Sequence, residues 1–200
     1  MKIIGLTGGS GAGKGEVCRI FAGYGLDSID TDEISRGITG KNSACLAELT
    51  RYFSGIILNS CGELDRKKLA ELAFSDKNNL EVLNKITHKY ILEECMRRIK
   101  AMETAGKTAV IIDAPLLFES GFDGCCDIII SVTAQKNERI KRIISRDNLS
   151  LEQAVRRIEN QKDDDFFSAH SDYIIKNNGT PEELEKQIYD IYTNIFKTER

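Results

Sequence analysis

The sequence predicts an α/β fold built on a mostly parallel β-sheet with helices on both faces. Two observations carry this prediction: short apolar runs alternate with stretches of helical periodicity, and a glycine-rich loop joins the first apolar run to the first helical stretch. Alternation of this kind builds βαβ units, whose parallel strands are buried on both faces. The runs that we expect to form strands are Lys2–Leu6, Leu26–Ile29, Thr108–Ile112, Asp127–Val132 and Tyr173–Ile175. A ligand site should lie at the carboxyl ends of these strands.

Helical patterns fill the intervals between the strands. Between about residues 35 and 106 there is no strong strand signal, and helical stretches cover Arg66–Phe74 and Asn79–Thr104. We interpret this segment as a helical insertion on one side of the sheet. Two later helix starts carry capping sequences. Ser150–Gln153 is typical of a capping box, and Thr180–Glu183 places proline at the first helical position and glutamate at the third.

Length and composition are those of one large domain, or of one domain with an insertion. Of the 200 residues 41% are hydrophobic and 30% are charged, with a net charge of −3. This balance argues against nucleic-acid and membrane-surface partners, so local cationic clusters must meet any anionic ligand. No apolar run approaches the ~18 residues of a membrane-spanning helix. Because the first strand begins at once, we expect neither a signal peptide nor a membrane anchor, and a cytoplasmic location.

The six cysteines show no C-x-x-C spacing. In a chain with these features we expect reduced core residues rather than disulfides or zinc ligands. Cys125 and Cys126 are the one pair in which oxidation would be worth testing.

The glycine-rich loop is the most informative segment. Residues 8–15 fit the phosphate-binding pattern G-x-x-x-x-G-K-[ST] at every position except the last, where Gly15 replaces the hydroxyl residue. Between a strand and a helix, backbone N–H groups and the helix dipole can converge on an anion, and glycines leave room for it. Lys14 would lie against the β- and γ-phosphates of a nucleotide. The alternative is a plain glycine-rich turn. The expected nucleotide-binding residues of the loop are Gly9, Ser10, Gly11, Ala12, Gly13, Lys14 and Gly15.

Asp30 and Asp32 directly follow the second strand. Two carboxylates spaced i, i+2 at a strand end can point toward one substrate, where one could activate a hydroxyl and the other help to hold Mg²⁺. The alternative is a D-x-x-E helix cap formed by Asp30 and Glu33. Beside a phosphate loop we favour a functional role for Asp32.

Asp113 follows the apolar run of the third strand. An acid at the end of a hydrophobic strand is typical of a carboxylate that reaches magnesium directly or through water. A simple strand-end turn before Pro115 is the alternative.

Arg139, Arg142 and Arg146 have helical spacing and would form one narrow stripe. Such a stripe is usually a solvated face, but it is also what a phosphate-covering lid needs. We expect the nearby acidic run of residues 163–165 to be solvated charge. His88 lies in a helical pattern, where a core or surface role is the common one, and we assign no role to His170.

Several segments together resemble a known family. They are Gly5–Lys14, Ile29–Ile34, Gly62–Arg66, His88, Asp113–Glu119, Arg142–Asp147, Arg157 with Gln161, and Asp172–Asn177. In this order, over nearly the full length, the chain resembles the dephospho-CoA kinase family. The phosphate loop alone indicates only a nucleotide, whereas its combination with D-x-D and D-x-P-L-L-F-E is much more specific.

The resemblance implies a P-loop kinase of the nucleoside-monophosphate-kinase type, with three α/β/α layers and a five-stranded parallel sheet. It implies three parts: a core (about 1–34, 106–137 and 166–200), a helical substrate-side domain (about 35–105) and a lid (about 138–165). It further implies transfer of the γ-phosphate of ATP, with Mg²⁺, to the ribose 3′-hydroxyl of dephospho-CoA, which gives CoA and ADP.

The resemblance also implies residue roles. Lys14 and the loop would hold the ATP phosphates, Asp32 would orient or activate the 3′-hydroxyl, and Arg142 would face the phosphates from the lid. Asn177 would lie by the adenine. The candidate metal ligands, which come from the residue patterns described above, are Asp113 and Asp30. The acceptor side would include His88, Pro115, Leu116, Leu117, Phe118 and Glu119.

Three residues depart from the family pattern: Gly15 replaces serine or threonine, Lys89 replaces proline and Arg139 replaces glutamine. Without the hydroxyl, water or a carboxylate must complete the magnesium shell. Three hypotheses therefore stand: an active dephospho-CoA kinase with an adjusted metal shell, a related kinase for another hydroxyl acceptor or nucleotide, and a nucleotide- or CoA-binding paralogue impaired in catalysis.

Overall fold

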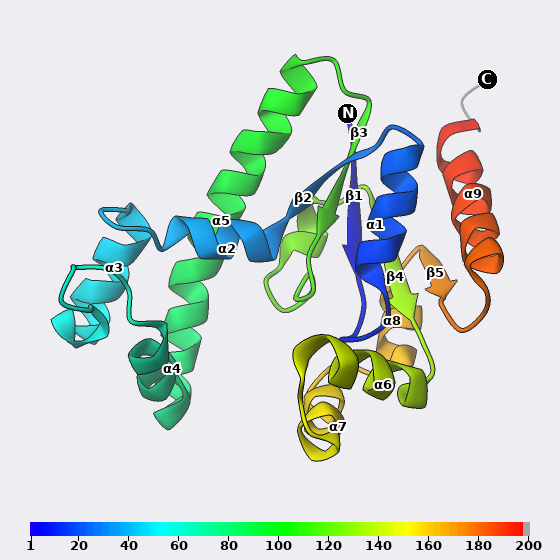
Figure 1. Cartoon of the computed structure of the whole chain (residues 1–200). Helices are drawn as coiled ribbons and strands as arrows, with labels where there is room; N and C mark the ends of the chain where they lie inside the picture. The colour runs from blue at the N-terminus through cyan, green and yellow to red at the C-terminus, as the bar shows by residue number, and fades with distance from the viewer. Residues whose placement is uncertain (198–200) are drawn as a thin grey trace. The chain divides into compact units, whose positions relative to one another are not determined.

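The computed structural model describes residues 1–197 and contains a five-stranded sheet (Figure 1). The strand order is β2-β3-β1-β4-β5, and β1 pairs in parallel with β3 and β4, as β4 does with β5. The strands are β1 (Lys2–Thr7), β2 (Asp27–Asp30), β3 (Ala109–Asp113), β4 (Ile128–Thr133) and β5 (Tyr173–Lys176). The predicted fold class is confirmed, and each predicted strand is correct to within one residue at either end.

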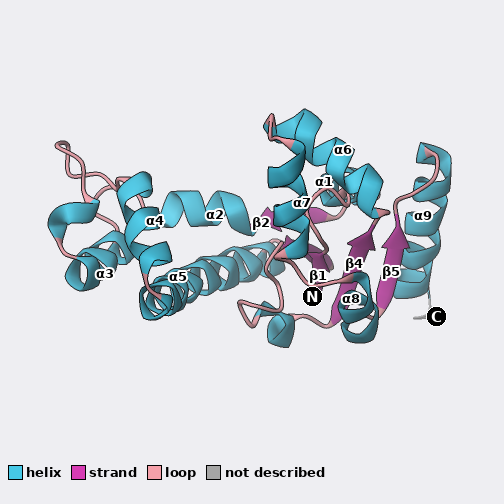
Figure 2. Ribbon diagram, turned by 90° about the horizontal axis from the view of Figure 1, so that it is seen from below, coloured by secondary structure: helices cyan, strands magenta, loops and turns pink. Residues whose placement is uncertain are grey.

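Helices cover both faces of this sheet (Figure 2). Helix α1 (Lys14–Gly23) contacts α9 (Pro181–Lys197), and α8 (Asp164–His170) contacts β4 and β5. Helices α6 (Lys136–Asp147) and α7 (Leu151–Glu159) pack on each other. With the sheet residues, these helices form one compact unit, Met1–Ile29 with Gly106–Arg200, so the segment expected to be the lid belongs to the same unit as the core strands.

Alternation along β1 explains how the layers pack. Ile4 and Leu6 are fully buried in the cluster that includes Phe21 of α1. Gly5 faces the other way, where a Cβ would lie 2.9 Å from Leu117 Cδ2 and 2.8 Å from Cys126 Sγ. The small residue therefore lets the segment after β3 lie directly against the sheet.

The second compact unit, Asp30–Ala105, is helical. It contains α2 (Thr31–Ile38), α3 (Ala44–Phe53), a 3-10 turn (Gly55–Ile57), α4 (Arg66–Ser75) and the long α5 (Lys77–Thr104). The predicted helical stretches are confirmed. Its core is formed by Cys45, Leu49, Phe53, Ile57, Leu69 and Ile86. Side-chain caps start each helix, because Asp30, Ser43, Asp65 and Asp76 each accept a backbone N–H of the first turn.

Both predicted capping sequences are confirmed. The Ser150 hydroxyl accepts from Gln153 N while the Gln153 side chain accepts from Ser150 N. The Thr180–Glu183 pair makes the same two reciprocal bonds. The acidic run of residues 163–165 is more than the solvated charge that we expected, because Asp163 caps α8 by accepting from Phe166 N at 2.8 Å.

The six cysteines are free thiols. Cys45 and Cys95 are buried as expected, whereas Cys61 is exposed, so its assignment to the core was wrong. Its backbone N–H bonds the Asn59 side chain in a surface turn. Within residues 1–197, no helix combines the length and apolar character needed to cross a membrane.

Candidate active site

The phosphate loop follows β1 and takes a shape that requires glycine. Gly8, Gly11 and Gly13 have φ angles of 137°, 76° and 102°, in the region that side chains with a Cβ rarely adopt. Space is also restricted, because a Cβ on Gly11 would lie 2.6 Å from Arg139 O and one on Gly13 would collide with the Asn177 amide. Gly13 is the N-cap of α1, so the loop opens onto a helix N-terminus, where anions are favoured.

Lys14, the first residue of α1, turns back along the loop. Its Nζ donates to Gly8 O at 3.1 Å, which holds the ammonium beside the loop backbone. The next position is open: a Cβ built on Gly15 meets nothing within 4 Å. Packing therefore does not exclude a serine or threonine side chain at residue 15.

Arg142 and Asn177 meet at the same turn of the loop, although they are far apart in sequence. Arg142 Nη1 donates to Gly11 O and Ala12 O at 3.3 Å, and Nη2 donates to Asn177 O at 3.1 Å. Asn177 Nδ2 donates to Ala12 O at 2.8 Å. Beside them is a pocket of about 520 Å³ lined by Gly11, Gly13, Lys141, Arg142, Ser145 and Arg146. Its cationic lining suits an anionic ligand.

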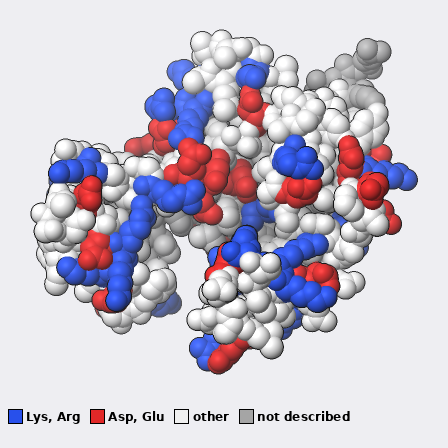
Figure 3. Space-filling view, viewed as in Figure 1, with Lys and Arg blue, Asp and Glu red and all other residues white. Residues whose placement is uncertain are grey.

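The three arginines lie on α6 at the predicted helical spacing, but their environments differ. Arg139 is buried against Ser10, Arg142 binds the loop carbonyls, and Arg146 pairs with Asp147 while its side chain remains 61% exposed. Burial lowers the pKa of the Arg139 guanidinium, and the Asp164 carboxylate acts in the opposite direction. Helical spacing alone does not distinguish these environments, because they depend on which arginines the phosphate loop contacts. Lys and Arg side chains gather over α6 in Figure 3.

Asp113 lies at the end of β3, in register with Leu6 just before the loop. Cys18 Sγ of α1 donates to Asp113 Oδ2 at 3.6 Å. These contacts place the carboxylate between β1 and α1, the two elements that flank the phosphate loop. Within residues 1–197 there is no group of three or more His, Cys, Asp or Glu side chains that could hold a metal ion.

The segment after Asp113 has both a buried and an open side. Leu117 is fully buried against Gly5, so its expected contact with substrate would require this turn to open. Leu116 is 53% exposed. Phe118 contacts the rings of Phe166 and His170, with centroids 5.2 Å and 5.8 Å away.

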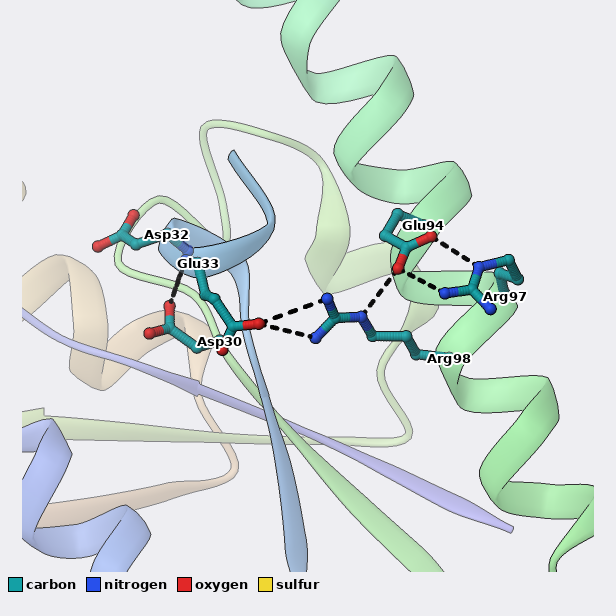
Figure 4. Close-up of polar contacts among 6 residues, drawn as sticks. All are labelled: Asp30, Asp32, Glu33, Glu94, Arg97 and Arg98. Atoms are coloured by element: carbon teal, nitrogen blue, oxygen red, sulfur yellow. Dashed lines mark hydrogen bonds and ion pairs between the residues drawn. The ribbon is translucent and has the colours of Figure 1, made fainter. Parts of the chain in front are cut away.

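In the helical unit, Asp30 and Asp32 have different surroundings (Figure 4). Asp30 Oδ1 accepts from Asp32 N at 2.8 Å and from Glu33 N at 3.1 Å, which confirms the capping alternative for Asp30. Asp32 is exposed on the first turn of α2, and its carboxylate points away from Asp30, Glu33 and the arginines of α5.

An ion-pair chain holds α2 to α5 (Figure 4). Glu33 Oε1 accepts from Arg98 at 3.3 Å, and Glu94 accepts from Arg98 at 2.9 Å and from Arg97 at 2.7 Å. Hydrogen bonds from Arg97 and then Arg98 lower the pKa of Glu94 to about 2.

His88 lies half-buried on α5, one residue before the Lys89 that departs from the family pattern. Lys89 Nζ pairs with Glu48 Oε2 at 2.9 Å, and Tyr90 donates to the same oxygen at 2.6 Å. The Tyr90 bond and then the Lys89 bond lower the pKa of Glu48. Lys89 therefore ties α5 to α3.

Comparison with known proteins places this site in a family. The family model described as dephospho-CoA kinase matches residues 2–183. A dephospho-CoA kinase from Corynebacterium efficiens is 38% identical over 196 residues, which cover 96% of this chain and 98% of the relative. A dephospho-CoA kinase from Campylobacter jejuni superposes with a TM-score of 0.72 at 28% identity, covering all of both chains.

A shikimate kinase from Acinetobacter baumannii shares the fold, with a TM-score of 0.55 at 18% identity over 100% of this chain and 95% of that one. Identity that low shows the architecture alone. The family model and the full-length relatives are more specific, and neither supports another acceptor. The chain therefore belongs to the dephospho-CoA kinase family, a family of phosphotransferases with a hydroxyl acceptor.

Proposed function

We propose that this protein transfers the γ-phosphate of ATP to the ribose 3′-hydroxyl of dephospho-CoA, which gives CoA and ADP. The observation that carries the proposal is the phosphate loop: it contains three glycines with positive φ, and Lys14, Arg142 and Asn177 all bond its carbonyls, in a chain that matches the family over residues 2–183.

The loop would bind the phosphates of ATP. Its backbone N–H groups and the N-terminus of α1 provide dipoles, and Lys14 and Arg142 provide positive charge that would stabilise the transferring phosphoryl group. Both cations bind loop carbonyls, which supports a position beside the phosphates of bound ATP. Asn177, bonded to Ala12 O, would lie by the adenine. The proposed nucleotide-binding set is Gly9, Ser10, Gly11, Ala12, Gly13, Lys14, Gly15, Arg142 and Asn177.

Asp32 would serve the acceptor. Its exposed carboxylate would orient the 3′-hydroxyl and take its proton while the 3′ oxygen bonds to the γ-phosphorus and the bond to the departing ADP oxygen breaks. The helical unit and the segment after β3 would bind the rest of dephospho-CoA. The proposed acceptor contacts are His88, Pro115, Leu116, Phe118 and Glu119, with Leu117 anchoring the turn from the core.

The donor set fits Mg²⁺ at Asp113. Magnesium prefers oxygen ligands and is usually held by one or two carboxylates together with substrate phosphates and water. Asp113 would hold it directly or through water, and the bound ion would supply charge neutralisation at the phosphates. Asp30 is the weaker candidate, because its Oδ1 already caps α2. Gly15 contributes no side-chain oxygen, so water would complete the shell.

Measurement of ADP release tests the proposal. The purified protein is given ATP, Mg²⁺ and dephospho-CoA, beside acceptor-free, nucleoside-monophosphate and shikimate controls. We expect turnover that depends on dephospho-CoA. Turnover with another acceptor would support the related-kinase alternative. ATP binding without turnover on any acceptor would support the impaired paralogue.

A further inference from the structure

Arg139 is a buried cation that the proposed chemistry does not use. The residue is 5% exposed, and its Nε donates to Ser10 O at 2.9 Å. Its Nη2 donates to Gln161 Oε1 at 3.2 Å. Gln161 in turn accepts from Ser10 N at 2.8 Å and donates to Ser10 Oγ at 3.1 Å. Side chains from α6 and from the segment after α7 thus bind both backbone groups and the hydroxyl of one loop residue.

The glycines of the loop are matched to this arginine. A Cβ on Gly9 would collide with the Arg139 guanidinium, lying 2.7 Å from its Cζ. Gly8 and Gly11 have positive φ angles, whereas Gly9 does not, so the backbone of Gly9 is compatible with alanine. A Cβ on Gly11 would lie 2.6 Å from Arg139 O. The side chain of Arg139 therefore packs on Gly9 while its backbone packs on Gly11.

The surroundings of the guanidinium indicate a structural use of its charge. Its hydrogen-bond acceptors are neutral oxygens, and Asp164 Oδ1 lies 3.9 Å from Nη1. A buried charge is costly unless hydrogen bonds compensate for it. Here the planar fork of arginine lets one side chain reach Ser10 O and Gln161 at once, which the single ammonium of lysine cannot reproduce.

We propose that Arg139 is a positioning residue that holds the Gly9–Gly11 turn in its phosphate-binding conformation, acting through Ser10 and Gln161 and not by contact with the nucleotide. The inference rests on the proposed function only in that the loop binds ATP; it does not depend on the acceptor. Preorganisation of the binding groups lowers the cost of association, so loss of the fork should weaken nucleotide binding.

The first test measures Mg²⁺–ATP affinity by calorimetry in Arg139→Lys and Arg139→Met. We expect both variants to bind about 10-fold more weakly or worse, on the scale of one charged hydrogen bond. KM for ATP should rise in parallel while KM for dephospho-CoA is unchanged. Arg156→Met is the control, because Arg156 is 73% exposed and pairs with Glu152 on α7. Wild-type affinity in Arg139→Lys would show that charge suffices and would overturn the proposal, as would wild-type affinity in Arg139→Met.

The second test uses Gly9→Ala in two backgrounds. In the wild type the new methyl group displaces the guanidinium, so ATP binding should weaken as in Arg139→Lys. In an Arg139→Ala background the guanidinium no longer blocks the new methyl group, so Gly9→Ala should cause a smaller loss of ATP affinity than it does in the wild type. Fully additive losses would contradict the proposal. Circular dichroism and thermal unfolding identify any variant that fails to fold. If another variant does not fold, the ATP affinity of Arg139→Lys tests the proposal by itself.

These readouts separate the two proposals. If dephospho-CoA is not a substrate, the affinities still test Arg139. If the wild-type protein binds no ATP, both proposals fail.

Discussion

At the residue scale, Gly15 is the main departure from the phosphate-loop pattern, because it stands where the pattern has serine or threonine. A Cβ there meets nothing within 4 Å, and its backbone is not in the positive-φ region. The first turn of α1 can therefore accept a hydroxyl residue without rearrangement. In the proposed function Asp113 would hold the metal without help from a hydroxyl at residue 15, and water would complete the shell.

We predict that Gly15→Ser raises kcat/KM by roughly 10-fold or more and lowers the Mg²⁺ concentration for half-maximal rate, on the scale measured for partners of metal ligands. Gly15→Ala is the matched control. Replacing the helical glycine by alanine should stabilise the protein by about 0.5–1 kcal/mol, but it adds no oxygen. Steady-state kinetics across a Mg²⁺ titration separate the two effects. Equal kinetics in both variants would show that the native shell already compensates.

Asp32 carries the second prediction at this scale. Asp32→Asn keeps the size of the side chain but removes the proposed base, so kcat should fall by roughly 10²-fold or more while ATP affinity is retained. Glu33→Gln is the control, because its carboxylate is already paired with Arg98. It should keep most of the activity. Near-normal turnover in Asp32→Asn would leave Asp32 as a surface residue of α2.

At the element scale, hydrophobic patterning and caps were enough to predict the strands and most helices. Buried parallel strands are continuous apolar runs, and a capping box is a local signal, so both can be recognised without tertiary information. The Asp163 cap of α8 was missed because three consecutive acids look like solvated charge. The burial of Arg139 could not be predicted, because it depends on the loop that packs across α6 from 129 residues earlier in the chain.

The ion pairs of Glu94 with Arg97 and Arg98 lie within α5, beside the Arg98–Glu33 pair that joins α5 to α2, and they predict a pH dependence of stability. The pKa of Glu94 is about 2 in the folded protein against an ordinary 4.5. Its contribution to stability is therefore complete above pH 4.5 and is lost as the pH falls toward 2. Glu94→Gln should lower the free energy of unfolding by about 1 kcal/mol at pH 7, with a smaller difference at pH 3.5. Urea titrations of both proteins measure this, and a difference that grows on acidification would contradict it.

At the scale of the whole molecule, each compact unit has its own core, and the phosphate loop belongs to the sheet unit while Asp32 belongs to the helical one. The phosphate-loop motif lies within the sheet unit and indicates only a nucleotide, whereas the segments that indicate the acceptor run through both units.

The thiols report on both cores and provide a test of the whole fold. Cys61 is exposed, whereas burial raises the pKa of Cys45 to about 11 and that of Cys126 to about 12. Compared with an ordinary thiol of pKa 9.0, a pKa of about 11 leaves about 100-fold less reactive thiolate at pH 8. We predict that a short iodoacetamide pulse labels Cys61 first and leaves Cys45 and Cys126 almost unmodified, as read by peptide mass spectrometry.

In urea all six cysteines should react at similar rates, because unfolding removes the burial that raises these pKa values. Labelling of Cys45 as fast as Cys61 in the native protein would show that the helical unit opens readily, and equally fast labelling of Cys126 would show the same for the segment that packs on Gly5.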